Sequence, residues 1–447
     1  MENINESAER VLRFIEKSPS CFHVVENIKA ELVENGFTEL SEGEKWEVVP
    51  GGKYFTTRNS SSIISWVVPR FDFAGFFLTA SHSDSPSFKI KENECIVSEK
   101  HYIKLNVEKY GGMLCAPWFD RPLSVAGRVI TQKNNGNKIE LRQHLVNLDR
   151  DLLMIPNLAI HMNREANDGQ KYNVQNDLLP IFSFDENSEP DKNSFMKTVA
   201  ASIDVNADEI ISSDLFLYNR DKGKFWGNQN EFIASTKLDD LECAYTCFQG
   251  FLKAVPSPDD LESKDYENVL VNCIFDNEEV GSQTRQGAAS TFLYDTLRRI
   301  NLSCNRSEES FHMALSKSFM ISADNAHAVH PNHSDKSDPT NRPLVNMGPV
   351  IKFNAAQKYT TDSISAALFK AVCKKSGVPY QTFTNRSDMA GGSTLGNISG
   401  TQVSVPTVDI GLAQWAMHSP YESAGSKDPE YMEKVIFEFY KSSWNLA

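Results

Sequence analysis

A chain of 447 residues is longer than one hydrophobic core usually serves, so we expect two domains. Its 40% hydrophobic and 23% charged residues exclude a mainly disordered or collagen-like protein. The net charge of −14 disfavours binding to nucleic acid or to an anionic membrane. No apolar run approaches the roughly 20 residues that span a bilayer, and the acidic N-terminus does not look like a signal peptide. Eight cysteines without paired spacing predict reduced thiols in a cytoplasmic protein.

The sequence changes its periodicity twice. Apolar residues at helical spacing alternate with short strand-like runs near both ends of the chain. Between them, stretches such as 101–107 alternate apolar and polar residues, as half-buried strands do. We therefore predict an α/β domain formed by residues 1–92 and 231–447 and interrupted by an inserted β-rich domain at residues 93–230. Four runs in the α/β part predict buried strands: 74–80, 269–275, 319–323 and 405–411.

Acidic and imidazole side chains follow these four runs. In chain order they are His82, Asp84, Asp276, Glu278, Glu279, Asp324, His327 and His418. Sites in open α/β sheets gather just beyond the carboxyl ends of the strands, so we expect these residues to converge. Imidazoles and carboxylates suit zinc, or less specifically manganese or cobalt, and a spare carboxylate can act as general base on a bound water. Taken singly, each also fits a satisfied histidine, a solvated acidic face or a helix N-cap.

Two other groups of residues could bind metal by their spacing. His327, His330 and His333 are three residues apart, but Pro331 interrupts the helix that would align them. Cys243 and Cys247 lie one helical turn apart among apolar neighbours, which favours core packing.

Longer motifs carry a specific resemblance. They are SHSDSPSFKIK (81–91), WFDRPLSVAGRV (118–129), IPNLAIHMNR (155–164), KLDDLECAY (237–245), FDNEEVGS (275–282), SADNAHAVHPN (322–332), GPVIKFN (348–354) and AMHSP (416–420). In this order and over nearly the whole chain, they resemble the aspartyl aminopeptidase family of dinuclear-zinc metalloaminopeptidases. The resemblance implies an exopeptidase-like α/β/α catalytic domain interrupted by a β-rich oligomerisation domain.

The resemblance also implies roles for particular residues. Two Zn²⁺ ions per subunit, or Mn²⁺ or Co²⁺, would share Asp239 as a bridge. The remaining implied ligands are His82 and Asp324 for one ion, and Glu279 and His418 for the other. Glu278 would be the general base, and Asp84 would orient His82 by a hydrogen bond to its far nitrogen. Only the motif favours Asp239 over its neighbour Asp240, since either could be the N-cap ahead of Leu241.

His161 lies in the predicted insert and would otherwise be read as structural. In the resembling family, the histidine of this segment reaches the active site of a neighbouring subunit and helps to bind the scissile carbonyl. The resemblance thus implies a homo-oligomer, a tetrahedral dodecamer, in which His161 binds substrate in a partner's site.

The expected function is hydrolysis of the N-terminal residue of peptides, with Asp or Glu preferred. An acidic preference needs a basic group, for which Lys352 and Lys358 are candidates, whereas some family members carry a lysine where this chain has Ala356. Preference for neutral residues is one alternative. Two further alternatives are a catalytically silent assembly protein of the same fold and a dinuclear-zinc deacylase or carboxypeptidase.

Overall fold

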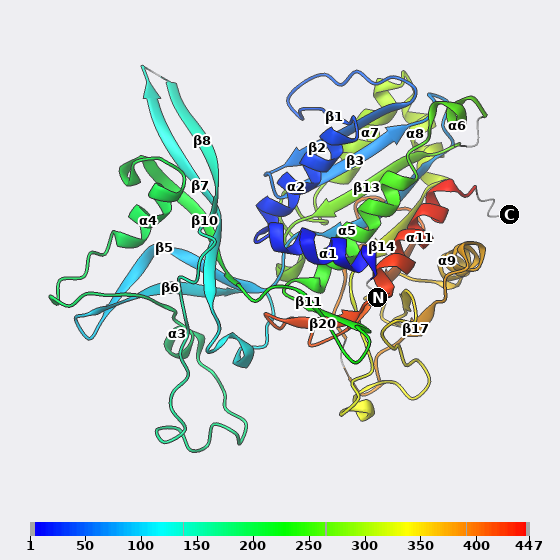
Figure 1. Ribbon diagram of the computed structural model, residues 1–447. Coiled ribbons are helices and arrows are strands. Elements are labelled where there is room, and N and C mark those ends of the chain that lie inside the picture. Colours follow the sequence, from blue (N-terminus) through cyan, green and yellow to red (C-terminus); the bar gives the residue numbers. More distant parts are fainter. Residues whose placement is uncertain (1–4, 137, 264–265, 390, 444–447) are drawn as a thin grey trace.

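The computed structural model describes residues 5–136, 138–263, 266–389 and 391–443. Within these ranges the chain forms three sheets, two of them large (Figure 1). The nine-stranded sheet has the spatial order β1 (Thr38–Glu39), β2 (Gly52–Arg58), β3 (Ser62–Val68), β13 (Val269–Phe275), β4 (Phe76–His82), β14 (Phe319–Ala323), β18 (Thr407–Gly411), β16 (Val350–Lys352) and β17 (Gln381–Phe383).

The centre of this sheet is buried on both faces. β13, β4, β14 and β18 are parallel neighbours, and every residue of these four strands is buried. In β13, alternate residues enter different cores: Leu270 and Ile274 pack on one face, Val271 and Cys273 on the other. Near-continuous apolar runs are what such doubly covered strands require. The carboxyl ends of the four strands therefore share one edge.

Helices cover both faces of the sheet. One core includes side chains of α1 (Glu6–Lys17), α2 (Cys21–Glu34), α5 (Leu238–Lys253), α9 (Ser363–Ser376) and α11 (Asp428–Lys441). The other core includes side chains of α7 (Phe292–Ser303), α8 (Glu308–Ser316) and α10 (Leu395–Ser399), while α6 (Pro258–Ser263) follows α5. In α1 the buried residues recur at helical spacing, and Asn5 caps the N-terminus by accepting from the amides of Ser7 and Ala8.

A six-stranded sheet stands to one side of this domain (Figure 1). Its order is β8 (Lys138–Asn147), β7 (Leu123–Asn135), β10 (Ile210–Asn219), β5 (Ser87–Ser98), β6 (Tyr102–Tyr110) and β9 (Ile181–Phe184), with α3 (Val174–Asp177) and α4 (Ser194–Ser202) in its connections. All its described pairings are antiparallel. It has its own core, which includes Phe88, Trp118 and Phe195.

A five-stranded sheet lies beside the carboxyl edge of the large sheet. Its order is β11 (Lys224–Trp226), β12 (Phe232–Ser235), β20 (Glu422–Gly425), β19 (Ala413–Trp415) and β15 (Ala326–His327). The predicted fold class, an α/β domain interrupted by a β-rich insert, is confirmed. Among the described residues, no helix has the length and apolar character needed to cross a bilayer.

Candidate metal centre

The candidate site lies at the carboxyl edge of the nine-stranded sheet. β4 ends at His82, and β13 ends at Phe275, three residues before Glu278. β14 ends one residue before Asp324, and His418 sits in the connection between β19 and β20. Because β4 pairs with both β13 and β14 in parallel, these residues lie close together.

Asp239 lies at the centre of the cluster. Its Oδ1 is 3.6 Å from His82 Nε2, and its Oδ2 is 3.3 Å from His418 Nε2. The same His418 nitrogen is 3.4 Å from Glu279 Oε2. Asp239 reaches this position because it and Asp240 have non-helical backbone angles at the start of α5.

Three groups of potential ligands share these residues. In each group, one ligand atom per residue lies within 4.8 Å of all the others. The groups are His82, Asp239, Asp240 and Asp324; His82, Glu278 and Glu279; and Asp239, Glu279 and His418. His82, Asp239 and Glu279 therefore occur in two groups each, as expected of a site for two adjacent cations.

Several carboxylate oxygens of the cluster have no hydrogen-bond partner in the protein, as expected of oxygens that bind cations. Asp239 Oδ1, Asp240 Oδ1 and Glu279 Oε1 are buried and accept no hydrogen bond. Burial raises the pKa of the Asp240 and Glu279 carboxyls well above their usual values, because a charge without a partner is costly in the interior. For Asp239 burial acts in the same direction, but His418 and His82 outweigh it and lower its pKa. Oxygen and imidazole donors in this arrangement suit Zn²⁺, Mn²⁺ or Co²⁺.

Glu278 is held beside these ligands by a short turn. Asn277 adopts the left-handed conformation (φ 63°), which asparagine tolerates better than most residues, and a 3-10 turn follows over Glu278–Val280. Burial, reinforced by the neighbouring carboxylates of Asp324 and Asp84 against the opposing effect of His82, raises the pKa of Glu278 to about 8. Without cations, the protein environment thus favours the protonated form of this carboxyl.

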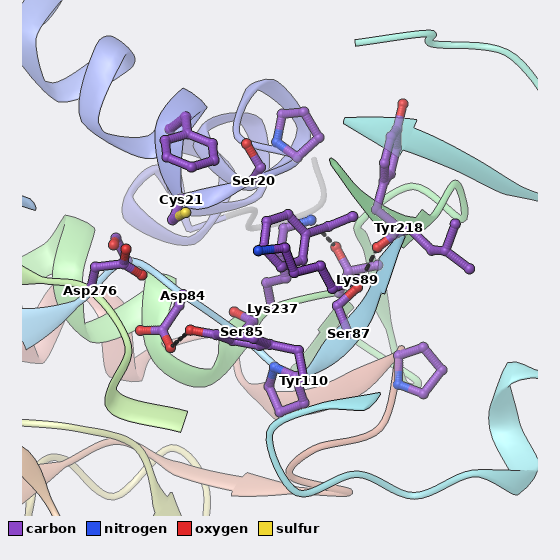
Figure 2. A pocket seen from close by; sticks show the side chains of 18 of the residues that line it. Ser20, Cys21, Asp84, Ser85, Ser87, Lys89, Tyr110, Tyr218, Lys237 and Asp276 are labelled. Carbon is purple, nitrogen blue, oxygen red and sulfur yellow. Dashed lines mark hydrogen bonds between the residues drawn. The ribbon is translucent and has the colours of Figure 1, made fainter. Parts of the chain in front are cut away.

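Asp84 lies behind His82 and connects several elements. His82 Nδ1 is 3.1 Å from the Asp84 backbone oxygen and 3.4 Å from its Oδ1. The Asp84 carboxylate accepts from the backbone amides of Glu278 (3.1 Å) and Glu279 (3.2 Å). It also accepts from the hydroxyl of Tyr110, at the end of β6 (Figure 2). The Asp84 carboxylate therefore contacts His82 and also the turn that carries Glu278 and Glu279.

The segment of the insert that follows Tyr110 lies against the candidate metal ligands. Gly111 has φ +77°, and a Cβ there would lie 3.1 Å from Glu279 Cβ, so both the backbone angle and the space favour glycine. The amide of Leu114 donates to the carbonyl of His418 at 3.1 Å. The insert thus supports the ligands from the same chain.

Three acidic or phenolic residues at the site, the buried Asp240 and Glu422 and the half-buried Tyr110, were not predicted from the sequence. Asp240 accepts from the His82 amide (3.1 Å), and Glu422 accepts from the amides of Asp239 (3.0 Å) and His418 (2.8 Å). The third is Tyr110. Asp240 had a weak signal in its pairing with Asp239. Glu422 and Tyr110 had none, because their contacts arise only when distant segments meet.

The two candidate lysines differ in position. Lys352, at the end of β16, is 3% exposed, donates to the Asn325 carbonyl at 2.9 Å and lies 3.7 Å from Asp324 Oδ2. Lys358 donates to the Gly391 carbonyl at 2.8 Å from an exposed position. Lys352 is therefore the one of the two that contacts the cluster.

The remaining candidates lie outside the cluster. His161 is exposed in a turn of the long loop that precedes α3, a loop that extends away from the inserted sheet (Figure 1). Within the described ranges, His327, His330 and His333 belong to no group of potential metal ligands. Cys243 and Cys247 pack in the core, as expected, and all eight cysteines are free.

Comparisons with known proteins cover nearly the whole chain. The family described as "Aminopeptidase I zinc metalloprotease (M18)" matches residues 14–440. A Clostridium acetobutylicum protein named "Probable M18 family aminopeptidase 2" is 49% identical over 442 residues, 98% of this chain and 100% of that protein. A protein of the same name from Ectopseudomonas mendocina is 40% identical over 441 residues, 98% of each chain.

Solved structures agree in fold over the same length. A structure described as the Ape4 and Nbr1 complex matches with a TM-score of 0.91 at 35% identity, covering 97% of this chain and 85% of that chain. A structure described as the S. cerevisiae mApe1 dodecamer matches with a TM-score of 0.82 at 26% identity, covering 97% and 96%. Both matches include the inserted sheet as well as the α/β domain.

Proposed function

We propose that this chain, which belongs to the M18 family of zinc metalloaminopeptidases, removes N-terminal Asp or Glu from peptides. The observation that carries the proposal is the position of Asp239 between His82 and His418, with Glu278 beside them. Two ions per chain would be held by one bridging carboxylate and two further residues each. The proposed ligands are His82 and Asp324 for one ion, Glu279 and His418 for the other, and Asp239 for both.

When bound, the ions would supply Lewis acidity that activates a water and polarises the scissile carbonyl. Glu278 would then hold the proton released by the attacking water and pass it to the leaving amine. The support is its place in the cluster, beside the proposed ligands His82 and Glu279. Asp84 would fix the ring of His82, so that Nε2 faces Asp239.

The acidic preference rests on Lys352. A buried ammonium beside Asp324 would attract a carboxylate on the first side chain of the substrate. The competing candidate is a neutral preference, which is favoured by the contacts that Lys352 already makes with Asp324 and the Asn325 carbonyl. The rates on peptides that differ only in their N-terminal residue, measured after reconstitution with zinc, manganese or cobalt, decide between the two. Faster cleavage of Leu or Ala than of Asp and Glu would reject the acidic preference.

His161 and the inserted sheet would serve assembly. Exposed apolar side chains flank His161 in its loop, namely Leu158, Ile160 and Met162, as expected of a segment that another subunit covers. We therefore propose a closed homo-oligomer, a dodecamer like the mApe1 match, in which His161 reaches the substrate in a partner's site. Enclosed sites would exclude folded proteins and admit short peptides.

A further inference from the structure

A cavity lies between the α/β domain and the insert, and Asp84, Asp239 and Glu422 of the candidate metal centre form part of its wall. Its volume is about 340 Å³, within the range of small-molecule sites. The α/β domain contributes the start of α2, including Cys21, and the insert contributes β5, β6 and β10 (Figure 2). Because residues far apart in the sequence wall it, the cavity is a product of domain packing.

Of the five carboxylates that line this cavity, four have partners within the protein; the fifth, Asp239, belongs to the candidate metal centre. Asp214 pairs with Lys89 (2.8 Å) and Arg128 (3.0 Å). Asp84 accepts from Tyr110, and Glu422 accepts from the Asp239 amide. Asp276 accepts from the Asn277 amide at 2.7 Å. These four acidic side chains thus direct acceptor oxygens to protein donors, and the proposed cations would occupy the free oxygen of Asp239.

Lys237 differs from the other two cationic side chains of the cavity wall, Lys89 and Arg128, in its hydrogen-bond partners. Its Nζ donates to Thr236 Oγ1 at 3.0 Å and lies 5.9 Å from the ring centroid of Tyr218. Among the described residues no carboxylate lies within ion-pair distance of it, unlike Lys89 and Arg128 in the same cavity. An ammonium has three donors, so two remain for an anion.

The start of α2 adds positive potential on the same cavity. Its first turn holds no acidic residue, and the N-cap Ser20 makes no side-chain capping bond, because its hydroxyl contacts His23 Nδ1 instead at 2.8 Å. Apolar and aromatic side chains form the other walls: Phe22, Trp118, Phe216, Leu217 and Tyr218. The cavity therefore combines one free cation, a helix N-terminus and an apolar surface.

We infer that this cavity, which adjoins the metal centre at Asp84 and Asp239, binds a small organic carboxylate with an aromatic or aliphatic body on Lys237 rather than on the metals. The carboxylate pairs with Lys237, and the body packs on the apolar wall. Pairing the half-buried ammonium of Lys237 with a carboxylate gives a charge-assisted hydrogen bond that a neutral isostere cannot reproduce. The site lies within the single chain and needs no second subunit.

The test is calorimetric titration of the metal-loaded protein with phenylacetate and with its neutral isostere phenylacetamide. We expect one phenylacetate per chain and at least about tenfold weaker binding of the amide. Lys237→Met should weaken phenylacetate binding to a similar extent. Lys222→Met is the matched control, because Lys222 is an exposed lysine paired with Glu16 at 2.6 Å.

Two further variants keep the inference falsifiable. Cys21→Phe, which fills the cavity without changing its charge, should also abolish binding, even if Lys237→Met does not fold. Glu279→Gln, altered at the metal centre, should bind phenylacetate as the wild type does. Equal binding of acid and amide, or binding that survives Lys237→Met or Cys21→Phe, would overturn the inference. Binding lost only in Glu279→Gln would place the anion on the metals and also overturn it.

Discussion

The hydroxyl of Tyr110, on the last residue of an inserted strand, donates a 2.7 Å hydrogen bond to Oδ2 of Asp84, the residue behind His82. Asn277 Nδ2 in turn donates to the Tyr110 oxygen at 2.9 Å. The insert therefore contributes to the support of the candidate ligands within its own chain. Contacts of this kind orient ligands, and their loss typically weakens metal binding.

Tyr110→Phe should lower metal affinity by about tenfold, because Asp84 then loses a donor and holds His82 and the Glu278–Glu279 turn less firmly. Titration of the apo-protein with zinc against a competing chelator measures the effect. Tyr102→Phe is the control, since Tyr102 lies at the other end of β6 and is 40% exposed. Equal zinc affinity in Tyr110→Phe and Tyr102→Phe would show that the bond is not needed.

Chelation should abolish peptidase activity, and Zn²⁺, Mn²⁺ or Co²⁺ should restore it. The reason is the set of buried oxygens without hydrogen-bond partners on Asp239, Asp240 and Glu279, which need cations. Hydrolysis of an amino-acid anilide before and after dialysis against chelator, with metal content measured in parallel, checks this. Full activity in protein shown to be metal-free would refute the metal dependence.

The trans-acting role of His161 predicts complementation. His161→Ala and Glu278→Gln subunits should each be nearly inactive alone. Mixed oligomers should recover part of the activity, because some sites pair an intact Glu278 with a partner's intact His161. Separately tagged subunits establish mixing. No recovery in oligomers that contain both tags would mean that His161 acts within its own chain or not at all.

His23 predicts a pH effect on stability. Burial, with a contribution from Lys237, lowers its pKa from 6.5 to about 4. The unfolded chain then binds more protons between these values, so stability is complete above pH 6.5 and falls as the pH drops towards 4. Relative to His23→Gln, the wild type should lose roughly 1–2 kcal/mol of unfolding free energy between pH 7.5 and 5. Parallel urea curves at the two pH values measure this, and an identical pH dependence of both proteins would contradict it.

The sequence predicted the part of the site that follows strands. His82 and Asp324 stand at or just beyond the ends of buried parallel strands, so their convergence follows from sheet topology. Asp239 follows no strand of that sheet in this way, and only the resemblance distinguished it from Asp240. In the structure both residues contact His82. The Asp239 carboxylate lies beside the His82 ring, and the Asp240 carboxylate accepts a hydrogen bond from the His82 backbone amide.

The supporting residues could not be predicted, for a physical reason. Tyr110 ends an alternating strand, and Glu422 begins a short one, so local periodicity assigns each a strand role and nothing more. Their contacts with Asp84 and with the amides of Asp239 and His418 join segments up to 183 residues apart. Such contacts exist only once the insert and the C-terminal sheet have packed on the α/β domain.

The most direct test of the account measures zinc content and turnover on the same samples of Glu278→Gln and Glu279→Gln. If Glu278 is the general base and Glu279 a ligand, Glu278→Gln should keep the zinc content of the wild type and lose activity by about 10²-fold or more, because an amide cannot accept the proton of the attacking water. Glu279→Gln should instead contain less zinc. Wild-type turnover in Glu278→Gln, or the same zinc loss in both variants, would contradict the assignment.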